Sequence, residues 1–263
     1  MYYFFLLIVA SIISSFLSGL FGMGGGLVMI PILCKAFHIM GTDETICMQI
    51  ATGTSLGVVA PTSILALREH WKHGAVDVSI LKDWMIVLPL TTAIASMLIF
   101  QVKIDLTRTV FAVFCFMMGC LIPLRNRLRF KGDFPTSLLR YFWGIFIGML
   151  SGIMGLGGGI FSNVLMLLYG RPINQAAAIS TGVGALIAFP GLLTHIYVGW
   201  GQENLPPMSL GFVNWGALLC LLPMSFMIAP MAARLSYKIK KIYLEAGFSV
   251  VMFLTSFSLF FKL

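Results

Sequence analysis

The chain has 263 residues, of which 59% are hydrophobic and only 10% charged, with a mean hydropathy of +0.98 and a net charge of +8. Soluble domains carry about 25% charged residues, so this chain has too little polar surface to cover a globule in water. Its Lys and Arg residues lie in short gaps between apolar runs rather than along a basic stripe, which excludes a nucleic-acid-binding domain.

The apolar runs predict an all-α, polytopic transmembrane bundle. Crossing a hydrocarbon core of about 30 Å takes about 20 apolar residues. The first run lacks the basic n-region of a cleaved signal peptide, so we interpret it as the first membrane helix. Together with two shorter apolar pieces, described in the next paragraph, these runs predict eight full membrane spans plus re-entrant pieces, or about ten membrane segments. The runs lie near 2–21, 46–67, 84–101, 107–124, 140–153 (a shorter one), 176–198, 211–232 and 243–261.

Two further apolar pieces, 27–37 and 160–169, are too short to cross the membrane. At about 1.5 Å per residue, each covers roughly half of the bilayer. Each piece directly follows a cluster of glycines, a residue that lets a helix break and the chain reverse. The sequence therefore predicts two glycine-broken half-helices.

The two glycine clusters are copies of one motif. Residues 18–26 read SGLFGMGGG and residues 151–159 read SGIMGLGGG, so six of the nine positions are identical. Further matches follow downstream at one constant spacing, slightly shorter than that of the motifs: Thr52-Gly53 with Thr181-Gly182, Pro61 with Pro190, and Trp71 with Trp200. We expect a first transmembrane repeat in 1–124, a basic cytoplasmic linker in 125–139 and a second transmembrane repeat in 140–263.

The distribution of basic residues predicts the orientation. The gaps near 68–83, 125–140, 170–175 and 233–242 hold thirteen of the seventeen Lys and Arg. By the positive-inside rule these gaps are cytoplasmic, and both termini are extracytoplasmic. The first glycine break is then reached from outside and the second from inside, so the halves have inverted topology. Glycine-interrupted segments at matching positions of inverted repeats point to the binding site of a transporter.

The glycine clusters are the first candidate site. A half-helix begins with N–H groups that lack a partner and with the positive end of its dipole, so two such ends could hold an anion near the midplane. The alternative is close helix packing through small residues. The candidate substrate-binding glycines are Gly22, Gly24, Gly25, Gly26, Gly155, Gly157, Gly158 and Gly159.

Neutral polar residues beside the glycines form the second candidate set. They could cap helices whose ends face a cavity, and they favour a substrate held by neutral donors over one held by an ion pair. The alternative is hydrogen bonding of each hydroxyl to a carbonyl of its own helix. These residues are Gln49, Thr52, Thr54 and Ser55 in the first half, and Ser162, Asn163, Ser180 and Thr181 in the second.

Titratable residues are rare within the apolar runs. His195, late in the run 176–198, is the exception and is a candidate proton relay, with interfacial packing as the alternative. A second group stands at the end of the run 46–67, where we expect a solvated cytoplasmic anchor, or else a vestibule that attracts anions. That group comprises Arg68, Glu69, His70, Lys72 and His73.

The remaining residue patterns do not favour catalysis. The five cysteines have no paired spacing, and we interpret them as small packing residues. The sequence contains no HExxH, no GxSxG and no Cys/His ligand set, so we expect no metal, no cofactor and no enzyme activity.

The chain resembles the sulfite exporter TauE/SafE family, also called the toluene sulfonate uptake permease family. The resemblance rests on SGLFGMGGGLVMIPIL (18–33), ATGTSLGVVAPTSILALREH (51–70), SGIMGLGGGIFSNVLMLL (151–168) and ISTGVGALIAFPGLL (179–193). It implies a secondary transporter of the bacterial cytoplasmic membrane for small sulfur-containing or organic anions. The family's motif maps onto the two glycine clusters and onto Thr52 to Ser55, and the second copy loses hydroxyls.

We therefore expect a secondary transporter that moves a small anion, such as sulfite or a sulfonate, by alternating access. Its partners would be that anion, the lipid bilayer and a coupling proton. Two other functions stay open: a non-transporting membrane subunit that assembles or regulates a partner, and an anion channel.

Overall fold

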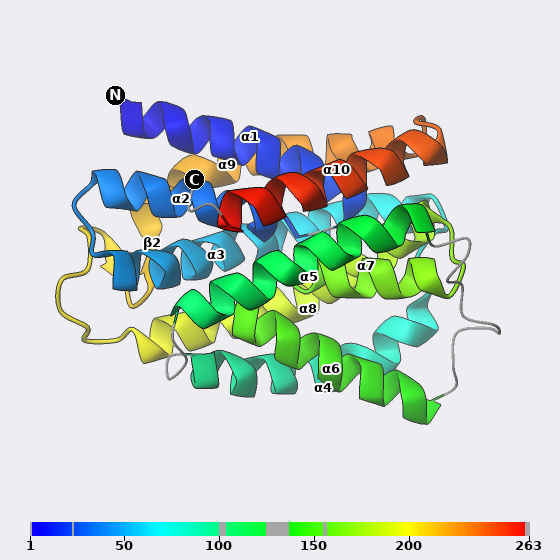
Figure 1. Cartoon of the computed structure of the whole chain (residues 1–263), viewed down its shortest axis with the longest axis horizontal. Helices are drawn as coiled ribbons and strands as arrows, with labels where there is room; N and C mark the ends of the chain where they lie inside the picture. The colour runs from blue at the N-terminus through cyan, green and yellow to red at the C-terminus, as the bar shows by residue number, and fades with distance from the viewer. Residues whose placement is uncertain (1, 23, 100–103, 125–136, 155–156, 261–263) are drawn as a thin grey trace.

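The computed structural model describes residues 2–22, 24–99, 104–124, 137–154 and 157–260, and its described part is an all-α bundle (Figure 1). The two half-helices that the sequence predicts are present as α2 and α7, each directly after its glycines. The helices are α1 (Tyr2–Phe21), α2 (Gly26–Ile39), α3 (Glu44–Lys72), α4 (Val78–Ile99), α5 (Ile104–Leu124), α6 (Ser137–Met154), α7 (Gly159–Leu168), α8 (Ile173–Val198), α9 (Trp215–Ser236) and α10 (Lys241–Phe260).

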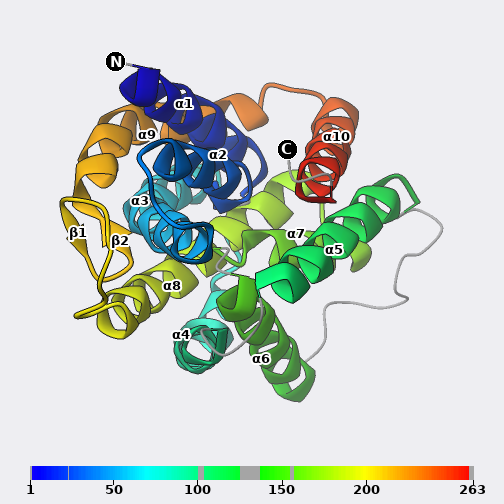
Figure 2. The same cartoon turned by 60° about the vertical axis from the view of Figure 1, so that its left-hand side comes forward.

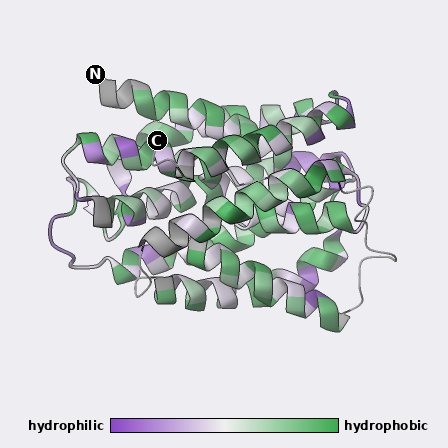
Figure 3. Ribbon diagram, viewed as in Figure 1, coloured by the Kyte–Doolittle hydropathy of each residue, from purple (hydrophilic) through white to green (hydrophobic). Residues whose placement is uncertain are grey.

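The helices run between two ends of the molecule. The start of α1 and the end of α10 lie toward one end, together with the α2–α3 connection (Figure 1). The α3–α4, α7–α8 and α9–α10 connections, which carry basic residues, lie at the opposite end (Figure 1). Hydrophilic residues gather at both ends and apolar residues between them (Figure 3). The assignment of the basic end to the cytoplasm stays a prediction.

The helices of the two halves pack in matching pairs. The first helix of each half packs against the fourth helix of the other, as α1 against α9 and α6 against α4 (Figure 2). The third helices, α3 and α8, pack against each other, and so do the fifth helices, α5 and α10. An inverted duplication would produce this pairing, because it exchanges each element with its copy.

Small residues four positions apart let α1 approach α9 closely, as is common where membrane helices pack. The Ser11 hydroxyl donates to the carbonyl of Leu221 at 2.7 Å, and Ser15 donates to Ser225 at 2.7 Å. A methyl group added at Gly19 would meet the backbone of Ala229. The interface therefore depends on backbone proximity and hydroxyl bonds rather than on bulky apolar side chains.

The same spacing recurs where α6 packs against α4. Gly144, Gly148 and Gly152 lie against Trp84, Thr91 and Ala95 in turn, and a methyl group added at any of the three glycines would meet those side chains. When the two glycine motifs are aligned, this stripe of α6 matches the stripe Ser11, Ser15 and Gly19 of α1 position by position.

Several predicted boundaries differ from the structure: α3 continues to Lys72 rather than ending near 67, α4 begins at Val78 rather than near 84, and α9 begins later than expected. The run expected from 211 begins its helix only at Trp215, because Ser209–Leu210 (β1) and Val213–Asn214 (β2) pair as an antiparallel hairpin. Asn214 ends the hairpin and caps α9, since its side-chain oxygen accepts from the amide of Ala217 at 2.8 Å.

Within the described residues, four helices are long and apolar enough to cross a membrane: Ile46–Lys72, Val78–Leu98, Ile173–Val198 and Trp215–Ser236. Large apolar side chains stay exposed on the outer faces, for example Ile86 at 70%, Met227 at 64% and Leu254 at 65%. Such a surface suits lipid rather than water as its solvent.

Candidate functional site

Both half-helices begin at a glycine with a left-handed backbone. Gly25, at φ 70°, precedes α2, and Gly158, at φ 64°, precedes α7. Gly22 and Gly24 in the first break also have positive φ, at 68° and 76°. Other residues adopt this region only at a cost, so the glycines allow the chain to reverse inside the bundle. The first break is fixed by the Ser14 hydroxyl, which donates to the Gly25 carbonyl at 2.7 Å.

The two breaks touch each other. A methyl group added at Gly24 would lie 3.4 Å from the Cα of Gly157, and one added at Gly157 would lie 3.6 Å from the Cα of Gly24. These glycines occupy the same position of the two motif copies. Gly22 packs against the backbone of Ala177 in α8. We call the meeting of Gly24 and Gly157 the glycine contact.

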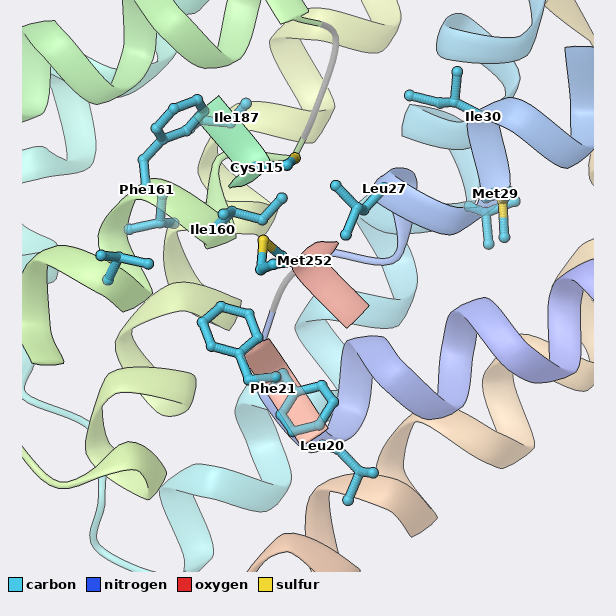
Figure 4. Close-up of a cluster of buried hydrophobic side chains, with 14 of the residues drawn as sticks. Leu20, Phe21, Leu27, Met29, Ile30, Cys115, Ile160, Phe161, Ile187 and Met252 are labelled. Carbon is cyan, nitrogen blue, oxygen red and sulfur yellow. The ribbon is translucent and has the colours of Figure 1, made fainter. Parts of the chain in front are cut away.

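Apolar side chains surround the starts of both half-helices. Leu27 and Ile160, the second residues of α2 and α7, belong to one buried cluster with Phe21, Ile187 and Met252 (Figure 4). The cluster draws on helices of both halves. The polar groups near the glycine contact therefore lie in mainly apolar surroundings, where hydrogen bonds and dipoles act more strongly than in water.

One face of α3 covers the glycine contact. Val59 lies 3.4 Å from a methyl group added at Gly24 and 2.9 Å from one added at Gly157. Ser55 and Ser63 stand four residues before and after Val59, so a helix places all three on one face. Both serines are buried, at 0% and 1% exposure, and within the described residues their hydroxyls have no hydrogen-bond partner.

Three more buried oxygens in the second half have no hydrogen-bond partner in the described part of the chain: Asn174 Oδ1 at the start of α8, and two that lie near α7. The two near α7 are the Ser151 hydroxyl of α6 and the Oδ1 atom of Asn163 in α7 itself. Ser151 lies 2.9 Å from a methyl group added at Gly158, directly before α7. Buried polar atoms almost always have partners, so we expect water or a ligand to complete the hydrogen bonds of these oxygens.

The amide of Asn163 joins the halves. Its Nδ2 donates to the carbonyl of Phe21, at the end of α1 and directly before the first break. Ser63 lies 3.0 Å from a methyl group added at Gly184, and that methyl would lie 3.3 Å from the Gly157 carbonyl. The second break is thus enclosed between α3 and α8.

Other predicted site residues make local hydrogen bonds. Thr181 donates to Ala178 at 2.8 Å, and Ser180 donates to Ala176 at 2.7 Å. Ser162 donates to Ser180 at 3.1 Å and to the carbonyl of Gly159. Ser180 and Thr181 thus make the intrahelical bonds that the sequence left open as the alternative interpretation, and Ser162 makes one such bond besides its bond to Ser180 of α8.

The other three candidates of the first half lie closer than Ser55 to the N-terminus of α3. Thr54 accepts from the amide of Asn214 at 2.9 Å and so holds the hairpin. Thr52 is buried three residues before Ser55, and Gln49 is half-buried one turn earlier.

Three candidate glycines remain. Gly155 lies outside the described residues, whereas Gly26 and Gly159 are the first residues of α2 and α7.

His195 is buried, with 2% exposure, below the hairpin between α8 and α9. Its Nδ1 lies 2.8 Å from the carbonyl of Gly191 on its own helix, and its carbonyl accepts from the amide of Phe212. Its Cβ lies 3.0 Å from a methyl group added at Gly53. These contacts favour packing, and the proton relay stays a prediction.

At the basic end, Glu69 links the halves. Its carboxylate accepts from Arg234 of α9 at 2.7 and 2.9 Å and from Lys72 at 2.7 Å. Glu69 is only 6% exposed, so the expectation of a solvated anchor is wrong for this residue, although Arg68, Lys72 and His73 are exposed. Bidentate Arg–carboxylate pairs are geometrically specific, so this one fixes α3 against α9.

The neighbouring His70 is also buried, at 0% exposure, and its Nδ1 lies 2.7 Å from the Tyr237 hydroxyl. His73 stacks on the same Tyr237 ring, with the ring centroids 4.1 Å apart. Burial raises the pKa of Tyr237 to about 12, so the phenol keeps its proton at neutral pH. No sequence pattern indicates this contact, because Tyr237 lies 167 residues after His70.

The sequence model of the family described as sulfite exporter TauE/SafE matches residues 6–259. A probable membrane transporter protein of Haemophilus influenzae is 29% identical over 260 residues, covering 98% of each chain. One of Methanocaldococcus jannaschii is 28% identical over 193 residues, covering 73% of this chain and 72% of its own. One of Bacillus subtilis is 23% identical over 257 residues, covering 90% of each.

Proposed function

The chain belongs to the sulfite exporter TauE/SafE family and is a multi-pass membrane transporter, and on this premise we propose that it carries a small sulfur oxyanion or organosulfonate, such as sulfite. The proposed transport is secondary and crosses the cytoplasmic membrane by alternating access.

The observation that carries the proposal is the glycine contact. The chain segments that lead directly into the two half-helices meet there, and the first N–H groups of a helix, with its dipole, favour an anion. Four buried oxygens in this region have no hydrogen-bond partner in the described chain: Ser63 and Ser151 lie beside glycines of α8 and of the second break, Asn163 bonds to Phe21 before the first break, and Ser55 stands four residues before Val59. A serine hydroxyl can donate to an oxyanion, and the amide oxygen of Asn163 can accept from a protonated one.

The absence of basic residues from the site segments supports weak, reversible binding. Neither 36–67 nor 141–170 contains a Lys or Arg. An anion held by dipoles and hydroxyls can be released, whereas one buried against a fixed positive charge would have to break an ion pair.

Alternating access is supported by the way the halves interlock. Each half contributes one half-helix to the contact, and α1 and α6 each pack against the other half. A rocking motion of one half against the other would therefore open the contact toward one side and then the other. An anion leaving a negative interior gains about 2.3 kcal/mol per charge per 100 mV, which favours export.

Flux through liposomes tests the proposal. Purified protein is reconstituted, and labelled sulfite and a panel of sulfonates are followed with an imposed membrane potential. We expect saturable, potential-dependent flux in the wild type and its loss in Gly25→Leu and Gly158→Leu. Because a leucine at either glycine can also prevent folding, Ser55→Ala serves as the milder variant, and folded protein is measured by size-exclusion chromatography.

The outcomes separate the alternatives. Conductance that does not saturate would indicate a channel. No flux of any anion in the panel, with folded protein in the membrane, would overturn the proposal in favour of a non-transporting subunit.

A further inference from the structure

Two cysteines that are 13 residues apart in the sequence meet between α2 and α3. The sulfur atoms of Cys34 and Cys47 lie 2.6 Å apart, and the Cys47 sulfur lies 2.8 Å from the carbonyl oxygen of Cys34. A disulfide bond is about 2.05 Å long, so the pair needs only a small approach to become one. Sequence spacing alone predicts separate packing cysteines at these positions.

The fold holds the pair together through a short hairpin. Residues 40–43 connect the end of α2 to the start of α3, with Gly41 at φ 85°. The amide of Thr42 donates to the carbonyl of Phe37 at 3.1 Å, and the amide of Cys47 donates to that of Asp43 at 2.9 Å. The pair lies near this connection, at the end of the molecule toward which the N-terminus lies (Figure 1).

We propose that Cys34 and Cys47 are a redox modification site, whose reversible disulfide ties the half-helix α2 to α3. The predicted orientation puts this end on the extracytoplasmic side, where disulfides form and persist. Cys34 is half-buried and is the sulfur that an oxidant reaches, whereas Cys47 is fully buried and completes the bond.

The oxidant is a small aqueous disulfide, and the chemistry is two thiol–disulfide exchanges. The Cys34 thiol loses its proton, and its sulfur attacks the oxidant, forming a mixed disulfide and expelling one thiolate. The Cys47 sulfur, also deprotonated, then attacks the Cys34 sulfur and expels the second thiolate. The two protons released by the cysteines balance the two thiolates, so the oxidant is reduced to two thiols.

The proposed disulfide has no counterpart in the second half of the molecule. In the second half, the position that matches Cys34 by the alignment of the glycine motifs is Leu167, and the position that matches Cys47 by the downstream spacing is Ala176. The disulfide would therefore fix the half-helix that begins at Gly26 relative to the helix that carries Ser55 and Ser63, and would leave α7 unchanged.

Counting thiols tests the site. The purified full chain is treated with oxidised glutathione, denatured, and labelled with a maleimide that shifts each modified thiol on a gel. The wild type has five cysteines, and we expect three to remain modifiable, with an intact mass lower by two hydrogen atoms. In Cys34→Ser, all four remaining thiols should stay modifiable, except any that forms a mixed disulfide with glutathione. The control Cys115→Ser should lose two of its four.

Five modifiable thiols in the wild type, or a loss of two thiols that persists in Cys34→Ser, would overturn the site. A second measurement tests the tie itself, since a crosslink restricts the unfolded chain. Oxidation should raise the thermal midpoint of the wild type but not that of Cys34→Ser, and dithiothreitol should reverse the rise. A disulfide without this rise would overturn the tie. Neither measurement uses a transported substrate, so the test is independent of the proposed function.

Discussion

The two half-helices share one sequence motif but have different surroundings. Every residue of α7 from Gly159 to Leu167 is buried, and Phe161 packs on Phe114 of α5 with the ring centroids 4.3 Å apart. In α2, by contrast, Lys35, His38 and Ile39 are exposed. The duplicated glycines produce the same backbone break in both places. The packing of the neighbouring helices determines how well each break tolerates a substitution.

The difference is visible at the two N-cap glycines. A methyl group added at Gly25 would meet the Ser14 hydroxyl at 2.7 Å, which could rotate away only by losing its bond to the Gly25 carbonyl. One added at Gly158 would meet the side chain of Ile187 as well as the Ser151 hydroxyl at 2.9 Å. Close-packed apolar neighbours move less easily than a hydroxyl, so the second break is the more rigid.

The largest effect should come from alanine at these two positions. Gly158→Ala adds backbone strain of roughly 1–2 kcal/mol and overpacking of roughly 1–3 kcal/mol. Gly25→Ala adds the same strain and the loss of the Ser14 hydrogen bond, about 0.5–1.5 kcal/mol, but little overpacking. We expect the thermal midpoint in detergent to fall clearly further for Gly158→Ala. Equal falls in the thermal midpoint would show that the two breaks tolerate an added methyl group equally well, and would contradict the proposed difference in rigidity.

The next effect concerns Asn163, whose matching residue in the first half is the apolar Ile30. Asn163→Leu removes the hydrogen bond to Phe21 and leaves that carbonyl without its partner, at a cost of about 1–3 kcal/mol. Ile30→Val, as the matched change in α2, should cost about 0.5–1.5 kcal/mol. Chemical denaturation compares the two. A smaller loss for Asn163→Leu would contradict a structural link between the halves at this residue.

The helices and the two breaks can be predicted well from the sequence, because both depend on local features. Length, hydropathy and glycine content locate α2 and α7 to within a few residues. The contact of Gly24 with Gly157 is not local, and only the packed structure shows it. The repeat suggested it indirectly, since matching positions can meet where two halves face each other.

Individual site residues were harder to predict. Ser63 and Ser151 were not among the candidates, because a serine in an apolar run usually bonds to its own helix. That rule does hold for Ser162, Ser180 and Thr181. The small-residue stripes at Ser11, Ser15 and Gly19 and at Gly144, Gly148 and Gly152 are a local signal of helix packing, which hydropathy alone does not reveal.

A smaller effect should separate two adjacent hydroxyls of α3. The Ser63 hydroxyl has no partner in the described chain, whereas Thr62 donates to the carbonyl of Val58 at 2.7 Å. If Ser63 donates to the anion, Ser63→Ala loses about 1 kcal/mol of binding, which is roughly a fivefold rise in KM for sulfite. Thr62→Ala should change KM less than twofold. The same KM for both variants would place the anion away from this face of α3.

The smallest effect should come from His195. Its ring bonds to the carbonyl of Gly191, and Gln at this position keeps a polar group of similar reach. If the ring serves packing, His195→Gln should leave the flux and its pH dependence unchanged. A pH dependence that disappears in this variant would instead establish His195 as the proton relay.

The central claim is that an anion binds where the two half-helices meet under Ser55 and Ser63. Calorimetric titration of the purified protein with sulfite tests it most directly. We predict saturable binding in the wild type and in Thr62→Ala, and binding weakened at least tenfold in the double variant Ser55→Ala with Ser63→Ala. Undiminished binding by a folded double variant would contradict the claim.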